Sequence, residues 1–202
     1  MTQTQVAVSK ARNADEYREV LYSNLEEYDR LARMIADMLF IAKTDNHLMT
    51  MRREDTDIGA EIEQLVDFYQ ALADEQGVTI ARHGAGHLIG DALMVRRALS
   101  NLLSNAIRHT PRGGSVSISV SAAAAAHTMV RVENTGDAIP AEHLPRLFDR
   151  FYRVDRARSR NSDGAGLGLA IVKSIVEAHG GAISVASAAG TTVFEIDFPP
   201  ID

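Results

Sequence analysis

The sequence predicts an α+β protein: a two-layer sandwich of one mixed sheet and its helices, preceded by a long helix of the bundle type. Three observations lead to this prediction. Apolar residues recur at spacings of four and three along residues 15–46, which is typical of a bundle helix. Later segments alternate between helical and strand periods. Their order is irregular, which favours a mixed sheet backed by helices over a repeated strand–helix–strand unit.

The first predicted element is the helix at residues 15–46. Asp15 is its expected N-cap, and Asp45 with Asn46 marks its expected end. Further apolar residues widen the surface beyond one stripe, so the helix should pack on partner helices rather than stand in solvent. The seam consists of Tyr17, Leu21, Asn24, Tyr28, Leu31, Ile35, Met38 and Ala42.

A second segment starts near Thr56 and carries the α/β pattern. Its strands are expected to alternate apolar and polar residues with period two, and its helices to carry apolar faces. We expect helices at 58–76, 91–109 and 167–179, a short helix after Pro140, strands at 78–82, 87–90, 115–122 and 127–134, and a closing hairpin of 182–187 with 191–198.

Composition narrows the function classes. The 202 residues carry 27 acids and 21 bases, a net charge of −6, which argues against general nucleic-acid binding. The chain has no cysteine, so neither a disulfide framework nor a thiolate metal site is expected. No apolar run reaches the roughly 18 residues of a membrane span, and the N-terminus does not have the pattern of a signal peptide.

Three glycines alternate in "GAGLGL", residues 164–169, directly before a predicted helix. Glycine inside an element costs about 0.5–1 kcal/mol relative to alanine, so its use here favours a need for bare backbone. Unpaired N–H groups at a helix start, with the helix dipole, attract anions such as phosphate. The spacing fits neither a dinucleotide fingerprint nor a P-loop. Taken alone, the pattern is better explained by a turn before a helix.

The helix at 91–109 contains the second candidate group. Asn101 and Asn105 are four residues apart and share one face, which Arg108 joins. An amide oxygen can bind a hard cation such as Mg²⁺, whose other ligands are phosphates and water. The guanidinium of Arg108 can bind phosphate oxygens. A solvated polar face is the alternative, above all for Asn101.

With the glycines, these residues resemble the catalytic half of bacterial sensor histidine kinases. The resemblance covers nearly the whole chain, and its motifs occur in the order of the family. Within the family, the long helix and the phenylalanine box look most like the heavy-metal, copper-type sensor kinases. The matching segments are "NLLSNAIRHT" (101–110), "NTGDA" (134–138), "RLFDRFYRVD" (146–155), "GAGLGLAIVKSIVEAHGG" (164–181) and "GTTVF" (190–194).

The resemblance implies a Bergerat-type (GHKL) fold that binds ATP with Mg²⁺. Residues 56–202 would be the catalytic ATP-binding domain, and residues 1–50 a truncated dimerisation segment. Asn105 would hold Mg²⁺, and Arg108 would contact phosphate. His109 would lie against the nucleotide, and Asn101 would support the site or reach phosphate through water.

At the adenine end, the resemblance assigns Asn134 as acceptor for the amino group of the base. The family usually has aspartate there, and asparagine offers a neutral carbonyl oxygen in its place. Gly136 would let the backbone approach adenine, and Thr191 would join the water network around it. Ala138 replaces the second glycine of that motif, which is tolerable where φ is negative.

At the phosphate end, residues 153–163 would form a polar lid, with Arg153 and Arg158 as phosphate contacts. Phe148 and Phe151 are expected to act as hinges of this lid or to dock another domain. The loop and helix start that would turn backbone amides toward the triphosphate are Gly164, Gly166, Leu167 and Gly168.

Position 101 separates kinase from hydrolase. Relatives that hydrolyse ATP carry a glutamate there that activates water, and an amide cannot accept a proton. The nucleophile in this family is a histidine in an H-E-x-x-[ST]-P-like motif, and none of the seven histidines has that context. We therefore expect a kinase fragment that lacks its acceptor histidine and is not competent for autophosphorylation in cis.

The resemblance also implies partners and location. In the parent protein, phosphoryl groups would pass to an aspartate of a response regulator, and the dimerisation helices would form a homodimer. The chain would be the cytoplasmic portion of a bacterial inner-membrane protein and would meet the membrane only through segments outside this sequence. A degenerate Bergerat module acting through protein contacts alone is the alternative, motivated by Asn134 and Ala138. An anti-sigma serine kinase is disfavoured by the long bundle-type helix.

Overall fold

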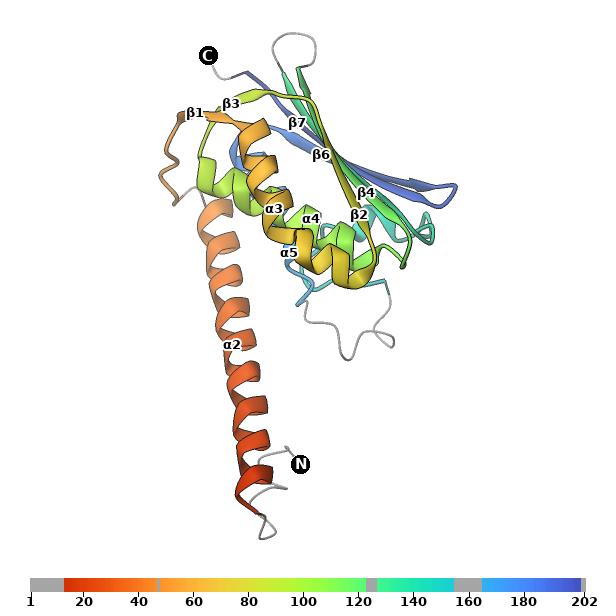
Figure 1. Cartoon of the computed structure of the whole chain (residues 1–202). Coiled ribbons are helices and arrows are strands. Elements are labelled where there is room, and N and C mark those ends of the chain that lie inside the picture. The colour runs from red at the N-terminus through yellow and green to blue at the C-terminus, as the bar shows by residue number, and fades with distance from the viewer. Residues whose placement is uncertain (1–12, 47, 123–126, 155–164, 201–202) are drawn as a thin grey trace. The chain divides into compact units, whose positions relative to one another are not determined.

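The structure is a computed structural model that describes residues 13–46, 48–122, 127–154 and 165–200 (Figure 1). The chain divides into two compact units, residues 1–39 and 40–202. Helix α2 (Ala14–Asp45) begins in the first unit, and its last turns belong to the second. The unit boundary therefore falls inside the helix, and the functional division expected between residues 50 and 56 stays a prediction.

The first unit is described by α2 alone. Asn13, and not Asp15 as predicted, caps the helix: its side chain accepts a hydrogen bond from the Glu16 N–H at 2.9 Å, and the Glu16 carboxylate accepts from the Asn13 N–H at 3.1 Å. This reciprocal pair satisfies two N–H groups that a helix start leaves unpaired. The predicted apolar seam is exposed, with Leu21 61% and Tyr28 64% accessible.

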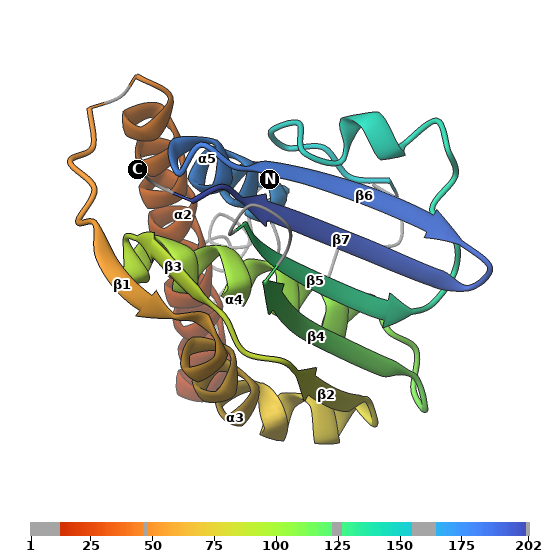
Figure 2. The ribbon, with the colours of Figure 1, turned by 90° about the horizontal axis from the view of Figure 1, so that it is seen from above.

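The second unit is built on a mixed five-stranded sheet, seen from above in Figure 2. The strand order is β2-β4-β5-β7-β6, where β2 is parallel to β4 and the other neighbours are antiparallel. The fold class predicted from the sequence is confirmed. The strands are β2 (Thr79–His83), β4 (Ser115–Ala122), β5 (Thr128–Thr135), β6 (Ala182–Ala188) and β7 (Thr191–Phe198).

A separate two-stranded antiparallel sheet joins β1 (Glu54–Asp57) to β3 (His87–Gly90). The sequence predicted β3 but not β1. Strand β1 reads "EDTD", so it has none of the apolar alternation by which strands are found. Its Thr56 is nevertheless buried.

Three helices cover one face of the large sheet (Figures 1 and 2): α3 (Ile58–Gln76), α4 (Ala92–His109) and α5 (Gly168–Ala178). Aspartates begin two of them. Asp57 accepts from the Ala60 N–H in α3, and Asp91 accepts from the Met94 N–H in α4, the usual function of an N-cap carboxylate. A short 3₁₀ helix, η2 (Leu144–Arg146), lies in the connection from β5 to α5.

The core lies between these helices and the sheet. On β7, buried and half-buried positions alternate strictly, so one face of the strand packs on the helices. Each large apolar side chain buried here contributes about 1.5–3 kcal/mol. Fully buried examples are Leu99, Leu102, Leu103 and Ile107 on α4, Ile171 and Ile175 on α5, Ile118 on β4, and Phe194 and Phe198 on β7.

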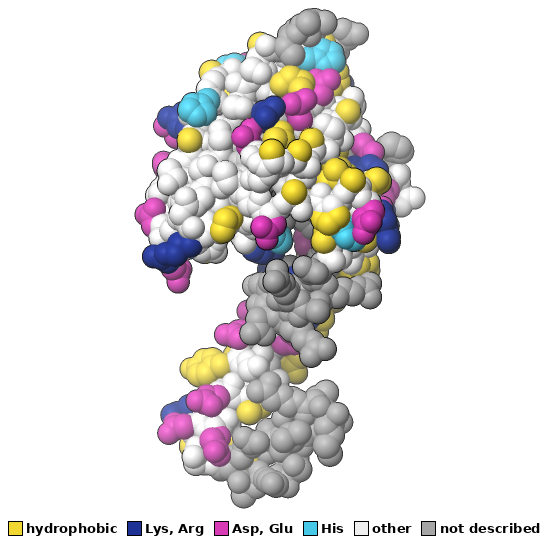
Figure 3. Space-filling view, turned by 90° about the vertical axis from the view of Figure 1, so that its right-hand side faces the viewer, with side chains coloured by type: hydrophobic (Ala, Val, Ile, Leu, Met, Phe, Trp, Pro, Cys, Tyr) yellow, Lys and Arg dark blue, Asp and Glu magenta, His cyan; other side chains and the backbone are white. Residues whose placement is uncertain are grey.

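Two surface properties bear on function. In Figure 3, basic and acidic side chains are interspersed over the face shown, as the modest net charge would suggest. Within the part of the chain that the structure describes, no helix combines the length and the apolar character that crossing a bilayer requires.

Candidate functional site

Helix α4 presents the two predicted asparagines at the border of its buried face. Asn101 and Asn105 are half-buried, one helical turn apart. A Cβ placed on Gly168 would lie 3.4 Å from Asn101 Oδ1, so the amide of Asn101 lies against the start of α5. Within the described residues, the side-chain amide of Asn105 has no hydrogen-bond partner. It is therefore available to a ligand.

The start of α5 is an uncapped helix N-terminus. Leu167 occupies the N-cap position, and its side chain makes no capping hydrogen bond. The Leu167 side chain is 1% exposed, so it anchors this end in the core, and within the described residues no side chain accepts from the first-turn amides. Such an end attracts anions.

The glycine loop is held by a short backbone contact. The Phe151 N–H donates to the Gly166 carbonyl at 2.9 Å. Gly166 has φ 72°, and a Cβ there would approach the Phe151 backbone to 3.0 Å. Both the conformation and the space require glycine at this position.

The opposite end of α4 meets the end of β5. A Cβ on Gly136 would lie 2.9 Å from the His109 carbonyl oxygen and 3.7 Å from Asn134 Nδ2. Asn134 is 5% exposed, and its Nδ2 donates to the Thr135 carbonyl at 3.2 Å. In the part of the chain described, its Oδ1 has no donor. A buried acceptor without a partner is rare and unfavourable, which indicates that a ligand supplies the donor.

The structure places Thr192, and not the predicted Thr191, beside Asn134. Thr192 pairs directly with Asn134 between β7 and β5 and is 5% exposed, on the face toward the helices. Thr191 points to the other face of the sheet, because successive strand residues alternate. The Thr192 hydroxyl is hydrogen-bonded to Ser187 Oγ at 2.8 Å. The sequence "GTT" contains two adjacent threonines, of which the prediction chose Thr191, and only the strand register distinguishes them.

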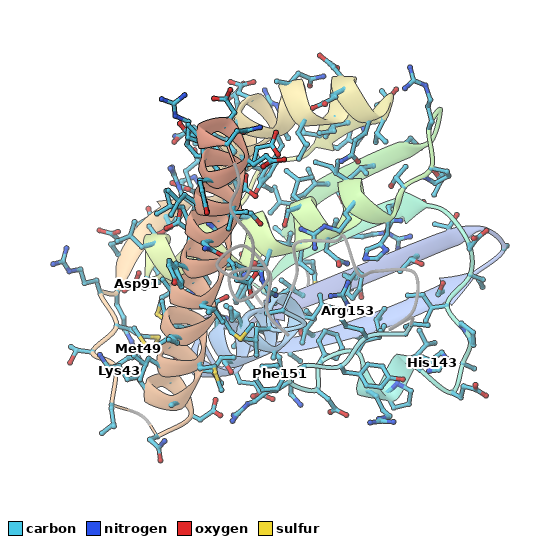
Figure 4. All side chains as sticks on the ribbon, turned by 90° about the horizontal axis from the view of Figure 1, so that it is seen from below. Lys43, Met49, Asp91, His143, Phe151 and Arg153 are labelled. Carbon is cyan, nitrogen blue, oxygen red and sulfur yellow. The ribbon has the colours of Figure 1, made fainter. Side chains whose placement is uncertain are left out.

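Positive charge gathers at the C-terminal end of α4. The pKa of His109 is lowered from its ordinary value of 6.5, because burial desolvates the imidazolium and because Arg108 and Arg153 repel it. Part of His109 still reaches solvent. Arg153 comes from the segment between η2 and α5 that also contains Phe151 (Figure 4). A bound anion would be attracted to this group of cations.

The remaining predicted residues divide three ways. Phe148 packs its ring on Phe194 at a centroid distance of 6.3 Å, whereas Phe151 is 43% exposed and has φ 62°. Among described residues other than glycine, only Phe151 and Ala189 have positive φ, so Ala138 fits its turn without strain. Arg158 and Gly164 lie outside the described residues, as do residues 155–163 of the predicted lid.

The polar groups form one line along α4. From Asn101 to His109 the helix rises about 12 Å. The uncapped end of α5 lies at the first position, and Asn134 and Gly136 lie at the last. Two surface hollows, of about 380 Å³ beside His179 and about 430 Å³ between α3 and α4, do not contain these residues. Unpaired groups rather than cavity size therefore locate the site.

The donor set also limits the kind of metal. Among the described residues no group of three or more His, Cys, Asp or Glu side chains could hold a metal ion. A cation bound here would rely on the oxygen of Asn105 and on oxygens from a ligand and from water, which is the usual situation of Mg²⁺.

Comparison with known proteins agrees with this geometry. Residues 90–202 match the family model described as histidine kinase-, DNA gyrase B-, and HSP90-like ATPase. Over 98% of its length the chain is 49% identical to the sensor histidine kinase CusS of Escherichia coli K12, of which it covers 42%. Over 98% of its length it is 46% identical to the sensor protein IrlS of Burkholderia pseudomallei, of which it covers 43%. The chain thus spans less than half of these relatives.

Solved structures give the same fold. The histidine kinase AdeS of Acinetobacter baumannii superposes with a TM-score of 0.78 at 19% identity, over 99% of this chain and 91% of that one. Full-length ShkA, solved in complex with AMPPNP, superposes with a TM-score of 0.79 at 27% identity, over 95% of this chain and 40% of that one.

Proposed function

The chain belongs to the family of histidine kinase-, DNA gyrase B- and HSP90-like ATPases, and we propose that it binds Mg²⁺–ATP and orients the γ-phosphoryl group for transfer to a histidine supplied from outside this sequence. The observation that carries the proposal is the unpartnered, buried Oδ1 of Asn134 at one end of α4, with an uncapped helix start at the other. Its similarity to heavy-metal sensor kinases over almost its whole length supports the kinase class.

Each end of the site would recognise one part of the nucleotide. The Asn134 oxygen would accept a hydrogen bond from the exocyclic amine of adenine, with Thr192 beside it and Gly136 leaving room for the base. The amides at the start of α5, with Arg108 and Arg153, would hold the phosphates. Arg158, Gly164 and the other residues of the predicted lid would complete this end.

Asn105 would provide one oxygen ligand to Mg²⁺, which would neutralise charge on the phosphates. The asparagine at position 101 supports transfer to a histidine over hydrolysis. Its amide lies against the start of α5 and cannot take a proton from water. The bound triphosphate would therefore persist until an imidazole nucleophile arrives. Onward transfer to a response regulator aspartate, homodimerisation and membrane attachment would be properties of the longer parent protein.

Calorimetric titration with a non-hydrolysable ATP analogue and Mg²⁺ tests the binding step. Wild type should bind, and Asn105→Ala should lose the part of the affinity that depends on Mg²⁺. Ser104→Ala is the matched control, since within the described residues its hydroxyl bonds only to the Asn101 carbonyl of the same helix, at 3.2 Å. Absence of binding to wild type would favour the degenerate module that acts through protein contacts alone.

Transfer is tested separately. Radiolabelled ATP is mixed with this chain and with a second protein that carries a helix with the family's acceptor histidine. Label should appear on the second protein and not on this chain, and it should disappear when Asn105→Ala replaces wild type. Label on this chain alone would contradict the expectation that it cannot phosphorylate itself.

A further inference from the structure

The last turns of α2, residues 40–45, are an integral part of the second compact unit. Ile41 is 2% exposed and Thr44 6% exposed. The guanidinium of Arg97 on α4 lies over the Phe40 ring at 4.1 Å from its centroid. The end of α2 is therefore packed on the helical layer that contains the nucleotide site.

Asp45, the final residue of α2, bonds to two segments that are distant from each other in sequence. One carboxylate oxygen accepts from the guanidinium of Arg150, and Oδ1 accepts from the Ser174 hydroxyl at 3.1 Å. Arg150 directly precedes Phe151, whose N–H bonds the Gly166 carbonyl. Ser174 lies six residues after Gly168 on α5. One carboxylate thus holds the chain on both sides of the phosphate end of the site.

These contacts are suited to positioning rather than to stabilising the fold. The side chains of Asp45 and Arg150 are 38% and 54% exposed, and exposed ion pairs contribute little to overall stability. Ser174, in contrast, is 7% exposed, so its hydroxyl has few other orientations. Loss of the carboxylate should leave the unit folded while its two flanking segments lose a common anchor.

We propose that Asp45 is a positioning residue that couples the end of α2 to the phosphate end of the nucleotide site. The inference rests on the proposed binding of ATP. Because Asp45 terminates α2, a displacement of the helix end would change how the phosphates are held. Coupling between sites is reciprocal, so a bound triphosphate would in turn tighten the contact of α2 with Arg150 and Ser174.

The test compares two ligands on the same variants. Asp45→Asn keeps a hydrogen-bond acceptor for Ser174 but removes the ion pair, and Arg150→Gln removes it from the other side. Each should raise the Kd of a non-hydrolysable Mg²⁺–ATP analogue about threefold to tenfold and leave the Kd of adenosine unchanged. The reversed pair Asp45→Lys with Arg150→Glu should restore the affinity. Glu177→Gln on α5, which breaks an exposed contact with Lys173 at 3.8 Å, is the matched control.

The outcomes separate this proposal from the proposed function. If wild type binds the analogue and Asp45→Asn binds it equally well, or loses adenosine to the same extent, Asp45 does not position the phosphate end and the inference is overturned. If wild type binds neither ligand, the proposed function itself fails. Ser174→Ala, which removes a single hydroxyl, provides a second variant if Asp45→Asn does not fold, and should also weaken only the triphosphate.

Discussion

Replacing Asn134 by leucine should separate folding from nucleotide binding. Leucine has the same branched arrangement of heavy atoms, with larger methyl groups in place of the amide oxygen and nitrogen, and it neither accepts nor donates hydrogen bonds. In the free protein it removes the bond from Nδ2 to the Thr135 carbonyl, worth about 0.5–1.5 kcal/mol. It also removes a buried acceptor without a partner, whose burial costs about 1–3 kcal/mol. The free energy of unfolding should therefore stay the same or rise.

Nucleotide binding should change in the opposite direction. In the complex, Asn134→Leu would leave the amino group of adenine buried without an acceptor. That loss is about 1–3 kcal/mol, or roughly a 5- to 150-fold increase in Kd. In wild type, a guanine nucleotide would place a carbonyl oxygen against Oδ1, so the preference for adenine over guanine should fall in the variant.

Urea unfolding gives the stability, and titration with non-hydrolysable ATP and GTP analogues gives the two affinities. Glu133→Gln is the control. Glu133 precedes Asn134 on β5, so its side chain points to the other face of the sheet, where it pairs with Arg131 at 2.8 Å. If Asn134→Leu kept the wild-type Kd within twofold, or lost stability and affinity together, the assignment of Oδ1 as the base acceptor would be wrong.

Three further predictions follow from the geometry. Thr192→Val should weaken binding of the ATP analogue severalfold while Thr191→Val leaves it unchanged, since of the two threonines Thr192 lies beside Asn134. The reverse result in the same titration would favour Thr191, the residue that the sequence predicts. Gly166→Ala should lower the unfolding free energy by about 1–2 kcal/mol through the positive φ alone. It should also lower the affinity for the ATP analogue, and an unchanged melting temperature would contradict the strain argument. The lowered pKa of His109 means that the unfolded chain takes up a proton near pH 6.5 while the native imidazole resists it. The contribution of this residue to stability is therefore complete above pH 6.5 and lost as the pH falls below it. Between pH 7.5 and 5.5, the unfolding free energy measured in urea should fall less for His109→Gln than for wild type. Equal falls would exclude a contribution of His109 to the pH dependence of stability.

The elements with strong periodicity were predictable from the sequence. The helix expected at 58–76 has those bounds in the structure, and the strand expected at 115–122 likewise. Both have apolar spacing over many residues, and aspartate or glycine marks the ends of α3. The sequence pattern did not predict strand β1, because the strand is stabilised by pairing with β3 and by burial of Thr56. Neither contact leaves a local pattern in four mostly charged residues.

The candidate site was predictable to the level of segments and less so to the level of single residues. Helix period alone put Asn101 and Asn105 on one face of α4. The choice between Thr191 and Thr192 depends on the register of β7 with β5, which arises from pairing across the sheet. The partners of Asp45 could not be foreseen either, because Arg150 and Ser174 lie more than 100 residues further along the chain. Sequence spacing carries no information about such contacts.

In the free protein, the described residues leave several polar groups of the site unsatisfied. Among the described residues, Asn134 buries an acceptor without a donor and α5 begins without a side-chain cap, while desolvation and then the charges of Arg108 and Arg153 lower the pKa of His109. The buried acceptor opposes folding, and the desolvated imidazole opposes it only as the pH falls below 6.5. An amine donor, phosphate oxygens and a negative charge on one ligand would match the three features in turn. A site of this kind gains affinity by removing penalties already present in the free protein, so variants that relieve a penalty by themselves should be more stable and bind less tightly. The asparagine at position 101 extends the argument to reactivity, because its amide cannot accept a proton and so would not activate water against a bound ATP.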